Sequence, residues 1–478
     1  MTQTDACRMT RAGMTLSVGE VLGKLATLAM FGVLARALGV ADFGAFSLGI
    51  GLGLLLSSIT TLGLDQRLVQ LAGTDPTSLS ARLSSLLALR GSLILLVVLG
   101  SAVVLPVVLD DPVGWHTALL LVAAGCADTI SEAYRSAASV RHVQSGPAIV
   151  LVLQRFLALG LVLVAVRADT GPTGAAVAYL AASVTGALLM AGTAYRRAEV
   201  RPAPGAVTRE HAGDFVAAVR VTGLNDLVSM ALFRVDVVML AALAGTVAVG
   251  HYTAAYRLLE TVLFVSWSVA RVILPALADS TVGGEARTRT VSGALVVVAA
   301  VYLPYAAVLL TRGDEVVRLL FGDDFGSPAV IMWLAAAPLF FGVAQIGIAG
   351  LLALRPDPAV LLASSLALVL NVGLNVALVP TWGATAAAAT TTLSYLVQAS
   401  VLMWALRRVI PTRGVLRATA LAAGASVLAG AAMLAPLPVV PALLLGGAVY
   451  AVAWWLATRR YDRPTLDLLR TVLAPGPS

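Results

Sequence analysis

The chain has 478 residues, of which 59% are hydrophobic and 12% charged, and its mean hydropathy is +0.92. Soluble domains carry about 25% charged residues, so this composition excludes an ordinary soluble enzyme and indicates a protein that crosses a membrane several times. The net charge of +7 would suggest nucleic-acid binding in a soluble chain, but the arginines lie mostly between apolar segments, and we expect no nucleic-acid partner. The two cysteines, Cys7 and Cys126, indicate no disulfide framework.

A membrane-spanning helix needs about 20 mostly apolar residues, and about fourteen segments of this sequence meet that requirement. In chain order they lie near residues 14–38, 42–64, 83–109, 114–135, 147–167, 173–194, 214–244, 248–277, 290–311, 328–354, 358–380, 383–406, 416–434 and 438–458. Because lipid cannot satisfy open backbone groups, continuous helices are the expected structure. The sequence therefore predicts an all-α polytopic membrane protein.

Positive charge is divided unevenly between alternate connections of these segments. One set of connections, together with both chain ends, holds most of the arginines, for example Arg141, Arg196, Arg197, Arg408 and Arg459. The other set holds little beyond Arg36, Arg167, Arg312 and Arg318. Since cytoplasmic loops carry an excess of Lys and Arg, we predict a multi-pass protein of the inner (plasma) membrane with both termini in the cytoplasm.

The sequence also resembles itself. The stretch "ALGVADFGAFSLGI" from Ala37 aligns with "LAGTVAVGHYTAAY" from Leu243, which pairs Gly39 with Gly245, Gly44 with Gly250, and Phe46 with Tyr252. A second stretch, "GPTGAAVA" from Gly171, aligns with "GATAAAAT" from Gly383. The offsets, 206 and 212 residues, are nearly equal, and each match falls at the same place in a six-segment pattern. This predicts two repeats of six helices with the same orientation in the membrane.

The repeat sets the expected domain organisation. It comprises a cytoplasmic N-terminus (1–13), a first six-helix bundle (14–195), a cytoplasmic linker (196–213), a second six-helix bundle (214–408), two additional spanning helices (409–460) and a cytoplasmic tail (461–478). The first span opens with "SVGEVLGKL", in which Gly19 and Gly23 form a small-xxx-small pair that permits close approach of another helix.

Charged residues recur on single faces of three predicted helices. The first helix carries Glu20 and Lys24, the seventh Asp226 and Asp236 with Arg234 nearby, and the eighth Arg257 and Glu260. Charge in mid-membrane costs at least about 2.5 to 3.5 kcal/mol per residue on insertion scales, so it normally faces protein or water. The repeat offset pairs Glu20 with Asp226 and Lys24 with Met230, which makes the second pair asymmetric.

Each of these charges also has a structural interpretation. Glu20 and Lys24 are four residues apart and could neutralise one another, and Arg257 with Glu260 could form a structural ion pair, as could Arg234 with Asp236. Arginines within about two turns of a cytoplasmic helix end, such as Arg90, are expected to extend toward the interface. The four histidines have no metal-ligand spacing, so we expect no metal site.

Two motifs carry a family resemblance. The segment "LNVGLNVALVPTWGATAAAATTTLSYLV", which contains Asn371, Asn375 and Thr390, and the segment "FRVDVVMLAALAGTVAVGHYTAAYRLLE" from Phe233 resemble polysaccharide and oligosaccharide-lipid flippases. These Wzx-type transporters belong to a superfamily with multidrug exporters and lipid II flippases. The resemblance covers most of residues 14–406, and one departure is Ala386, where the motif usually has Gly.

The resemblance implies two pseudo-symmetric six-helix bundles around a central cavity, plus two C-terminal helices. It also implies a non-enzymatic transporter, without a cofactor, that moves undecaprenyl-diphosphate-linked oligosaccharide to the outer leaflet by alternating access. Since arginine meets phosphate oxygens bidentately and stays protonated, the diphosphate is expected to contact Lys24, Arg234 and Arg257. Glu20, Asp226, Asp236 and Glu260 are then expected to balance charge or to couple transport to Na⁺ or H⁺.

Two other functions stay open. A cation-coupled multidrug or metabolite exporter of the same superfamily would use acidic residues in a more apolar cavity. A membrane-embedded glycan polymerase or ligase would need a sizeable outer loop, and the outer connections here are short. The expected partners are the lipid-linked glycan, the bilayer and, as a possibility, a polysaccharide polymerase or glycosyltransferases, with the protein itself a monomer.

Overall fold

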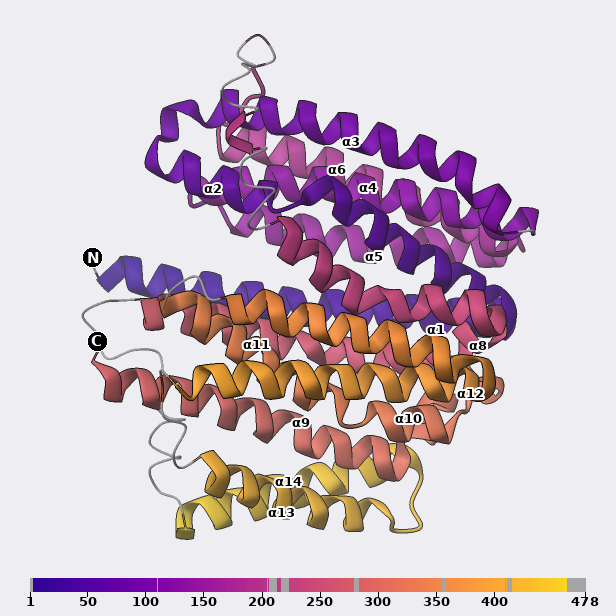
Figure 1. Cartoon of the computed structure of the whole chain (residues 1–478), viewed down its shortest axis with the longest axis vertical. Helices are drawn as coiled ribbons and strands as arrows, with labels where there is room; N and C mark the ends of the chain where they lie inside the picture. Colours follow the sequence, from indigo (N-terminus) through magenta and orange to yellow (C-terminus); the bar gives the residue numbers. More distant parts are fainter. Residues whose placement is uncertain are drawn as a thin grey trace. The chain divides into compact units, whose positions relative to one another are not determined.

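The computed structural model describes residues 3–109, 111–203, 205, 213–215, 223–278, 283–354, 358–408, 410 and 415–461. These described residues form helices and contain no strand (Figure 1). The chain divides into two compact units, residues 1–250 (unit 1) and 251–478 (unit 2), and each is described by itself. The predicted all-α fold is confirmed, whereas the predicted bundle boundaries stay a prediction, and the predicted linker and tail lie partly outside the described residues.

Unit 1 is built from six helices and the first part of a seventh. They are α1 (Gln3–Thr61), α2 (Leu64–Thr74), α3 (Leu79–Val108), α4 (Pro112–Val140), α5 (Ser145–Arg167), α6 (Gly171–Arg197) and the start of α8 (Leu224–Ala278). Helix α4 packs against α1, α3 and α6, and α5 packs against α1 and α6. The core between α2, α3 and α4 is formed by leucine and alanine side chains such as Leu68, Leu83 and Ala137.

Local sequence explains where these helices begin and break. Helix α4 starts at Asp111-Pro112, where the Asp111 carboxylate accepts hydrogen bonds from the backbone N–H groups of Val113 (3.2 Å) and Gly114 (3.0 Å). Helix α1 stops before α2 because Leu62 and Gly63 adopt positive φ angles of 39° and 72°, which a helix cannot contain.

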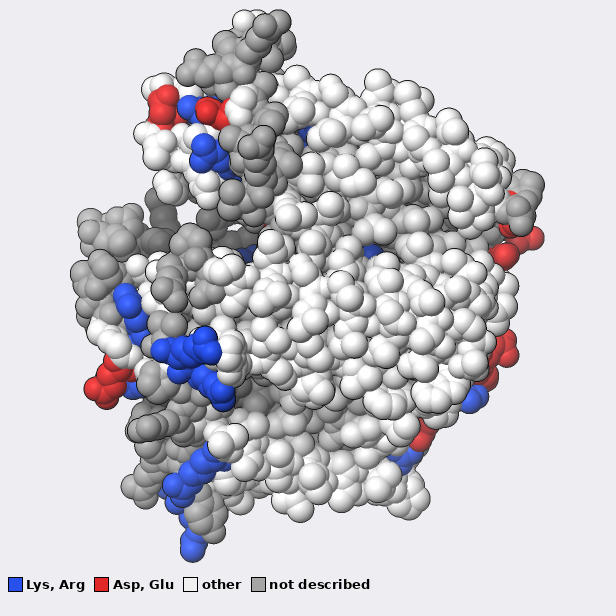
Figure 2. Space-filling model, viewed as in Figure 1, with Lys and Arg blue, Asp and Glu red and all other residues white. Residues whose placement is uncertain are grey.

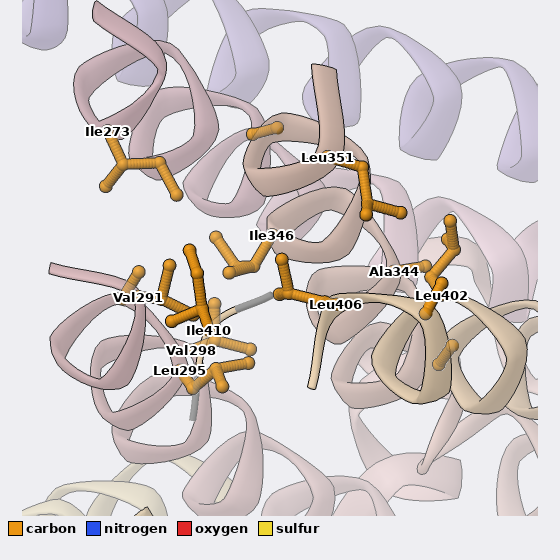
Figure 3. Packing of buried hydrophobic residues seen from close by; sticks show 14 of the residues in the cluster. Ile273, Val291, Leu295, Val298, Ala344, Ile346, Leu351, Leu402, Leu406 and Ile410 are labelled. Carbon is orange, nitrogen blue, oxygen red and sulfur yellow. The ribbon is translucent and has the colours of Figure 1, made fainter. Parts of the chain in front are cut away.

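Unit 2 contains the rest of α8 and all later helices. They are α9 (Gly284–Phe321), α10 (Pro328–Leu334), α11 (Ala337–Leu354), α12 (Pro358–Leu406), α13 (Val415–Met433) and α14 (Val439–Tyr461). Figure 3 shows the core of this unit, in which Ile273 of α8, Val298 of α9, Ile346 of α11 and Leu402 of α12 belong to one buried apolar cluster. The core therefore joins four helices that are far apart in sequence.

The last two helices are attached to α9 by polar contacts at specific positions. The Arg312 guanidinium of α9 donates to the carbonyl oxygens of Met433 (2.7 Å) and Ala435 (2.6 Å), which lie at the end of α13. The Tyr450 hydroxyl of α14 donates to the Ala300 carbonyl of α9 (2.7 Å). Since these acceptors are backbone groups, α13 and α14 have a defined position on α9.

Among the described residues, 11 helices are long and apolar enough to cross a membrane. Three of them have between 49 and 59 residues and contain one residue with non-helical backbone angles, which is Gly39 in α1, Gly245 in α8 and Gly383 in α12. A straight helix needs only about 20 residues to cross, so each of these bent helices has the length of two crossings. The structure is consistent with the roughly fourteen spans that the sequence predicts.

The surface of each unit suits a lipid environment. In Figure 2 the charged side chains of each unit lie mainly toward the helix ends, and the visible face between them is almost entirely uncharged. Large apolar side chains are exposed along the helices, such as Val107 of α3 (78% exposed) and Leu444 of α14 (71% exposed). Soluble proteins rarely expose such continuous apolar surface, so the chain is a multi-pass membrane protein.

Backbone angles support the internal repeat. Gly39 has φ 74° and ψ 177°, and its repeat counterpart Gly245 has φ 79° and ψ 175°. The second predicted pair, Gly171 and Gly383, also shares positive φ angles, of 64° and 52°. The combination at the first pair is accessible essentially to glycine alone. Both pairs were aligned from sequence, so the two halves bend at corresponding residues.

Candidate functional site

The N-terminal half of α1 carries the first predicted charges. Lys24 lies half-buried on this helix, and the side chain of Glu20 lies outside the described residues. A Cβ on Gly19 would meet Val152 at 3.2 Å and one on Gly23 would meet Arg155 at 3.6 Å, so α5 packs against this glycine face. The small-xxx-small pair therefore brings Lys24 into the region where α1 and α5 meet.

The first part of α8 carries three predicted site residues, all within unit 1. Arg234 and Asp236 are buried, and the Arg234 guanidinium lies 4.6 Å from the ring centroid of Phe233. An Asp236 carboxylate oxygen accepts a hydrogen bond from the Val237 backbone N–H (2.8 Å). Asp226, near the start of the helix, is half-buried and close enough to Asp65 for the two like charges to interact.

In unit 2 the structure brings together one predicted pair. The Arg257 guanidinium donates to the Glu260 carboxylate three residues further along α8, and both side chains are largely buried. Helical geometry places residues three apart on one face, which explains the pairing. The pair is neutral as a whole, which lowers the cost of keeping it within an apolar helix. The seven predicted site residues therefore lie in two groups, five in unit 1 and two in unit 2.

The structure corrects the expectation for Arg90. This side chain of α3 does not extend to an interface, because it is 0% exposed. It donates to the Asp65 carboxylate (2.8 Å), to the Thr60 carbonyl (3.2 Å) and to the Thr129 carbonyl (2.5 Å). Arg90 thus links the α1–α2 break to α4. Sequence reasoning missed this pair because its members are 25 residues apart on different helices, and no local spacing indicates it.

A second buried polar group was also missed. The Gln154 amide of α5 donates to the Asp128 carboxylate of α4 (2.7 Å). Gly186 of α6 leaves room for the amide, since a Cβ there would lie 2.5 Å from Gln154 Oε1. Asp128 is the only acidic residue inside an otherwise apolar stretch of α4 before Glu132, and that isolation was the signal that could have found it.

The family signature in α12 forms a buried hydrogen-bonded group. The Asn375 side-chain amide donates to Asn371 Oδ1 (2.8 Å), and the Thr390 hydroxyl donates to Asn375 Oδ1 (2.9 Å). These residues lie on the two sides of the bend at Gly383, so the group joins both arms of α12. The signature residues therefore contribute to the packing of the two arms of α12 against each other. Within the described part of the chain, no group of three or more His, Cys, Asp or Glu side chains could hold a metal ion.

The fold and its apolar helices define a multi-pass helical membrane protein, and comparison with known families is more specific. The family model described as "Polysaccharide biosynthesis protein" matches residues 9–281, and the one described as "Lipid II flippase MurJ" matches residues 150–453. Each match covers more than half of the chain. The chain therefore belongs to the flippase superfamily to which these two families belong. No curated protein compared with the chain matches it significantly.

Solved structures agree on the fold. The lipid II flippase MurJ in an inward closed conformation has a TM-score of 0.75 at 13% identity, over 94% of this chain and 99% of that chain. An inward-facing multidrug resistance MATE family transporter of the MOP superfamily has a TM-score of 0.57 at 16% identity, with coverages of 83% and 98%. A MATE transporter of Vibrio cholerae in the bent form has a TM-score of 0.56 at 15% identity, with coverages of 88% and 100%.

Proposed function

We propose that the protein moves undecaprenyl-diphosphate-linked oligosaccharide from the cytoplasmic to the outer leaflet for cell-surface polysaccharide biosynthesis. The observation that supports this most directly is the pair of family matches, one to polysaccharide biosynthesis proteins and one to a lipid II flippase. Transport proceeds by alternating access, in which the cargo is moved and not hydrolysed. In this proposal the protein lies in the inner membrane, both chain termini are in the cytoplasm, and the protein acts as a monomer.

The diphosphate of the cargo is the group that is hardest to carry across the membrane. Its negative charge cannot enter hydrocarbon without a cationic partner. Lys24, Arg234 and Arg257 are the three cations that we assign to this task, and all three lie within apolar helices. Arg257 is neutralised by Glu260 in the structure, and an arriving diphosphate would replace that carboxylate with a bidentate partner.

The acidic residues have a complementary role. Glu20, Asp226, Asp236 and Glu260 keep the site near neutrality between transport cycles, and one or more of them couples cargo movement to Na⁺ or H⁺. A coupling ion shifts the conformational equilibrium only if it binds one state more tightly than the other. Asp226 suits this role because its carboxylate is buried to a large extent and feels the like charge of Asp65, and both effects favour binding of a cation or proton.

The test is translocation of a fluorescent polyprenyl-diphosphate glycan across vesicles that contain the purified protein. We expect Lys24→Gln and Arg257→Gln to lower the initial rate at least about tenfold, which corresponds to about 1.4 kcal/mol of lost interaction. Arg289→Gln is the matched control, because this arginine is 67% exposed and lies outside the site. Normal translocation by both site variants would contradict the assignment of these two cations.

The same vesicles distinguish a multidrug exporter from a flippase. Efflux of cationic drugs driven by a Na⁺ or H⁺ gradient, without movement of the lipid-linked glycan, would replace the flippase proposal by the multidrug exporter. The MATE transporters of similar fold make this the second candidate. Release of free glycan or of longer chains would indicate a polymerase or ligase instead. Co-purification with a polysaccharide polymerase or with glycosyltransferases would test the proposed partners.

A further inference from the structure

Two repeat-related glycines make a reciprocal backbone contact. A Cβ on Gly44 would overlap the carbonyl oxygen of Thr246, and a Cβ on Gly250 would overlap the carbonyl oxygen of Val40. Both contacts lie within unit 1. Gly44 and Gly250 are repeat counterparts, and so are Val40 and Thr246, because both pairs are 206 residues apart. Each repeat therefore presents a glycine to the same carbonyl of the other, as in a two-fold interface.

In this crossing, which we call the glycine latch (residues 40–44 and 246–250), each glycine lies against a backbone carbonyl oxygen of the other segment, and the Val40 side chain also contacts Gly250. Only glycine allows these two backbone segments to approach this closely, since any other residue places its Cβ in the position of the opposite carbonyl oxygen. Contacts between a Cα–H group and a carbonyl oxygen are individually weak and bury no charge. A contact of this kind holds two segments close together through neutral groups.

A second observation is independent of the glycines. Ser47 and Thr253 are also repeat counterparts, and each stands three residues after its latch glycine. Their side chains are 2% and 3% exposed, and neither hydroxyl has a hydrogen-bond partner among the described residues. A buried hydroxyl without a protein partner is unfavourable, so both matched positions keep hydrogen-bonding capacity for water or cargo.

We propose that the glycine latch is the outer-side closure of the transport path, and that it opens by separation of its two backbone segments so that Ser47 and Thr253 meet water or cargo. The latch lies at the bends after the first and seventh spans, and the predicted orientation puts both bends on the outer side. The proposal rests on the proposed function only in that an alternating-access transporter needs such a closure. The symmetry implies that both repeats contribute equally.

The experiment measures accessibility across the latch. In a background with Cys7→Ser and Cys126→Ala, a single Ser47→Cys reporter is labelled by a membrane-impermeant maleimide from the outside of right-side-out vesicles. Gly250→Ala, which alters only the opposite repeat, should raise the labelling rate at least about tenfold, because the added methyl group disfavours the closed state. The reciprocal pair, Gly44→Ala with a Thr253→Cys reporter, should respond in the same way.

Gly100→Ala in α3 is the matched control, since a Cβ at that position meets no atom within 4 Å. It should leave both labelling rates unchanged. Equal labelling with and without Gly250→Ala, in protein that unfolds at the usual temperature, would overturn the proposal, and so would an equal rise in the Gly100→Ala control. Faster labelling from the cytoplasmic side instead would overturn the outer location.

The test also works if the alanine variants fail to fold. With all glycines retained, the Ser47→Cys reporter should react slowly but completely from the outside, because the latch opens spontaneously in an alternating-access cycle. Complete protection over many hours would overturn the proposal. None of these measurements uses cargo, so they are separate from the translocation assay. If the latch opens while no glycan moves, the proposed function is disproved and the latch proposal still holds.

Discussion

Arg90 in unit 1 and Arg257 in unit 2 look alike in the sequence but differ in their partners. Each is an arginine in an apolar segment, and each is buried. Arg90 uses its donors on a carboxylate and two carbonyl groups that belong to three other helical segments. Arg257 pairs with a carboxylate only three residues away on its own helix. Arg90 therefore holds helices together, whereas the Glu260 carboxylate that Arg257 binds lies on the same helix.

The difference gives a physical criterion for separating structural from functional charge in a membrane helix. A charge whose partners lie on several helices cannot be displaced without loss of tertiary structure, so it is a poor candidate for transient contact with cargo. A charge with one local partner can be released by a side-chain rotation. The contact of Arg257 with Glu260 is local in this sense, because both residues lie on α8. The predictions that follow test this criterion, beginning with the largest expected effect.

The largest effect is expected for Arg90→Ala. The variant leaves the Asp65 carboxylate buried without its cation and frees the Thr60 and Thr129 carbonyls, and we expect about 3 to 5 kcal/mol of lost stability. Thermal unfolding of the purified protein in detergent measures the change. Adding Asp65→Asn should recover part of the loss, because no buried charge is then left alone. Stability within about 1 kcal/mol of the native protein would break the comparison, since removing a buried partner costs several times more.

The next effect concerns the bends that the repeats share. Gly39→Ala and Gly245→Ala each place a side chain at backbone angles that only glycine adopts readily, and each should cost about 1 to 3 kcal/mol. The two losses should be similar if the repeats are equivalent. Unfolding measurements with Gly100→Ala as the control distinguish backbone strain from the addition of a methyl group. A loss confined to one bend would show that the two repeats are not equivalent there.

A smaller effect on stability is expected for the pair in unit 2. The double variant Arg257→Gln/Glu260→Gln removes both charges of this pair together, so neither is left without the other, and its stability should stay within about 1 kcal/mol of the native value. Glycan translocation by this variant should nevertheless fall about tenfold, because the cation assigned to the diphosphate is gone. Normal translocation would assign the pair a structural role and remove the contrast with Arg90.

The smallest effect is expected at the surface. Arg289 and Glu285 lie 3.6 Å apart on α9 and are 67% and 88% exposed, so water screens their attraction. Arg289→Gln should change stability by less than about 1 kcal/mol and leave translocation unchanged. Thermal unfolding measures the stability of this variant, and the vesicle assay measures its translocation rate. A large loss would mean that exposure does not separate the weak pairs from the strong ones in this protein.

The sequence by itself determined the helical membrane fold, the approximate position of the apolar spans, and the glycines that correspond between the repeats. These features depend on local properties, namely apolar runs of sufficient length and glycines at matched positions, and both are readable along the chain. The pairing of Arg257 with Glu260 was also foreseen as one alternative, because helical spacing alone brings the two residues together.

Only the tertiary structure decided which charges are joined across helices. The contact of Arg90 with Asp65, the contact of Gln154 with Asp128 and the reciprocal approach of Gly44 and Gly250 depend on how separate helices pack. No periodicity records such packing, because a side chain's partner on another helix is set by the depth and rotation of both helices. For that reason the expectation that Arg90 extends to the interface was wrong, and the alignment of Gly44 with Gly250 did not reveal that the two residues lie at one contact.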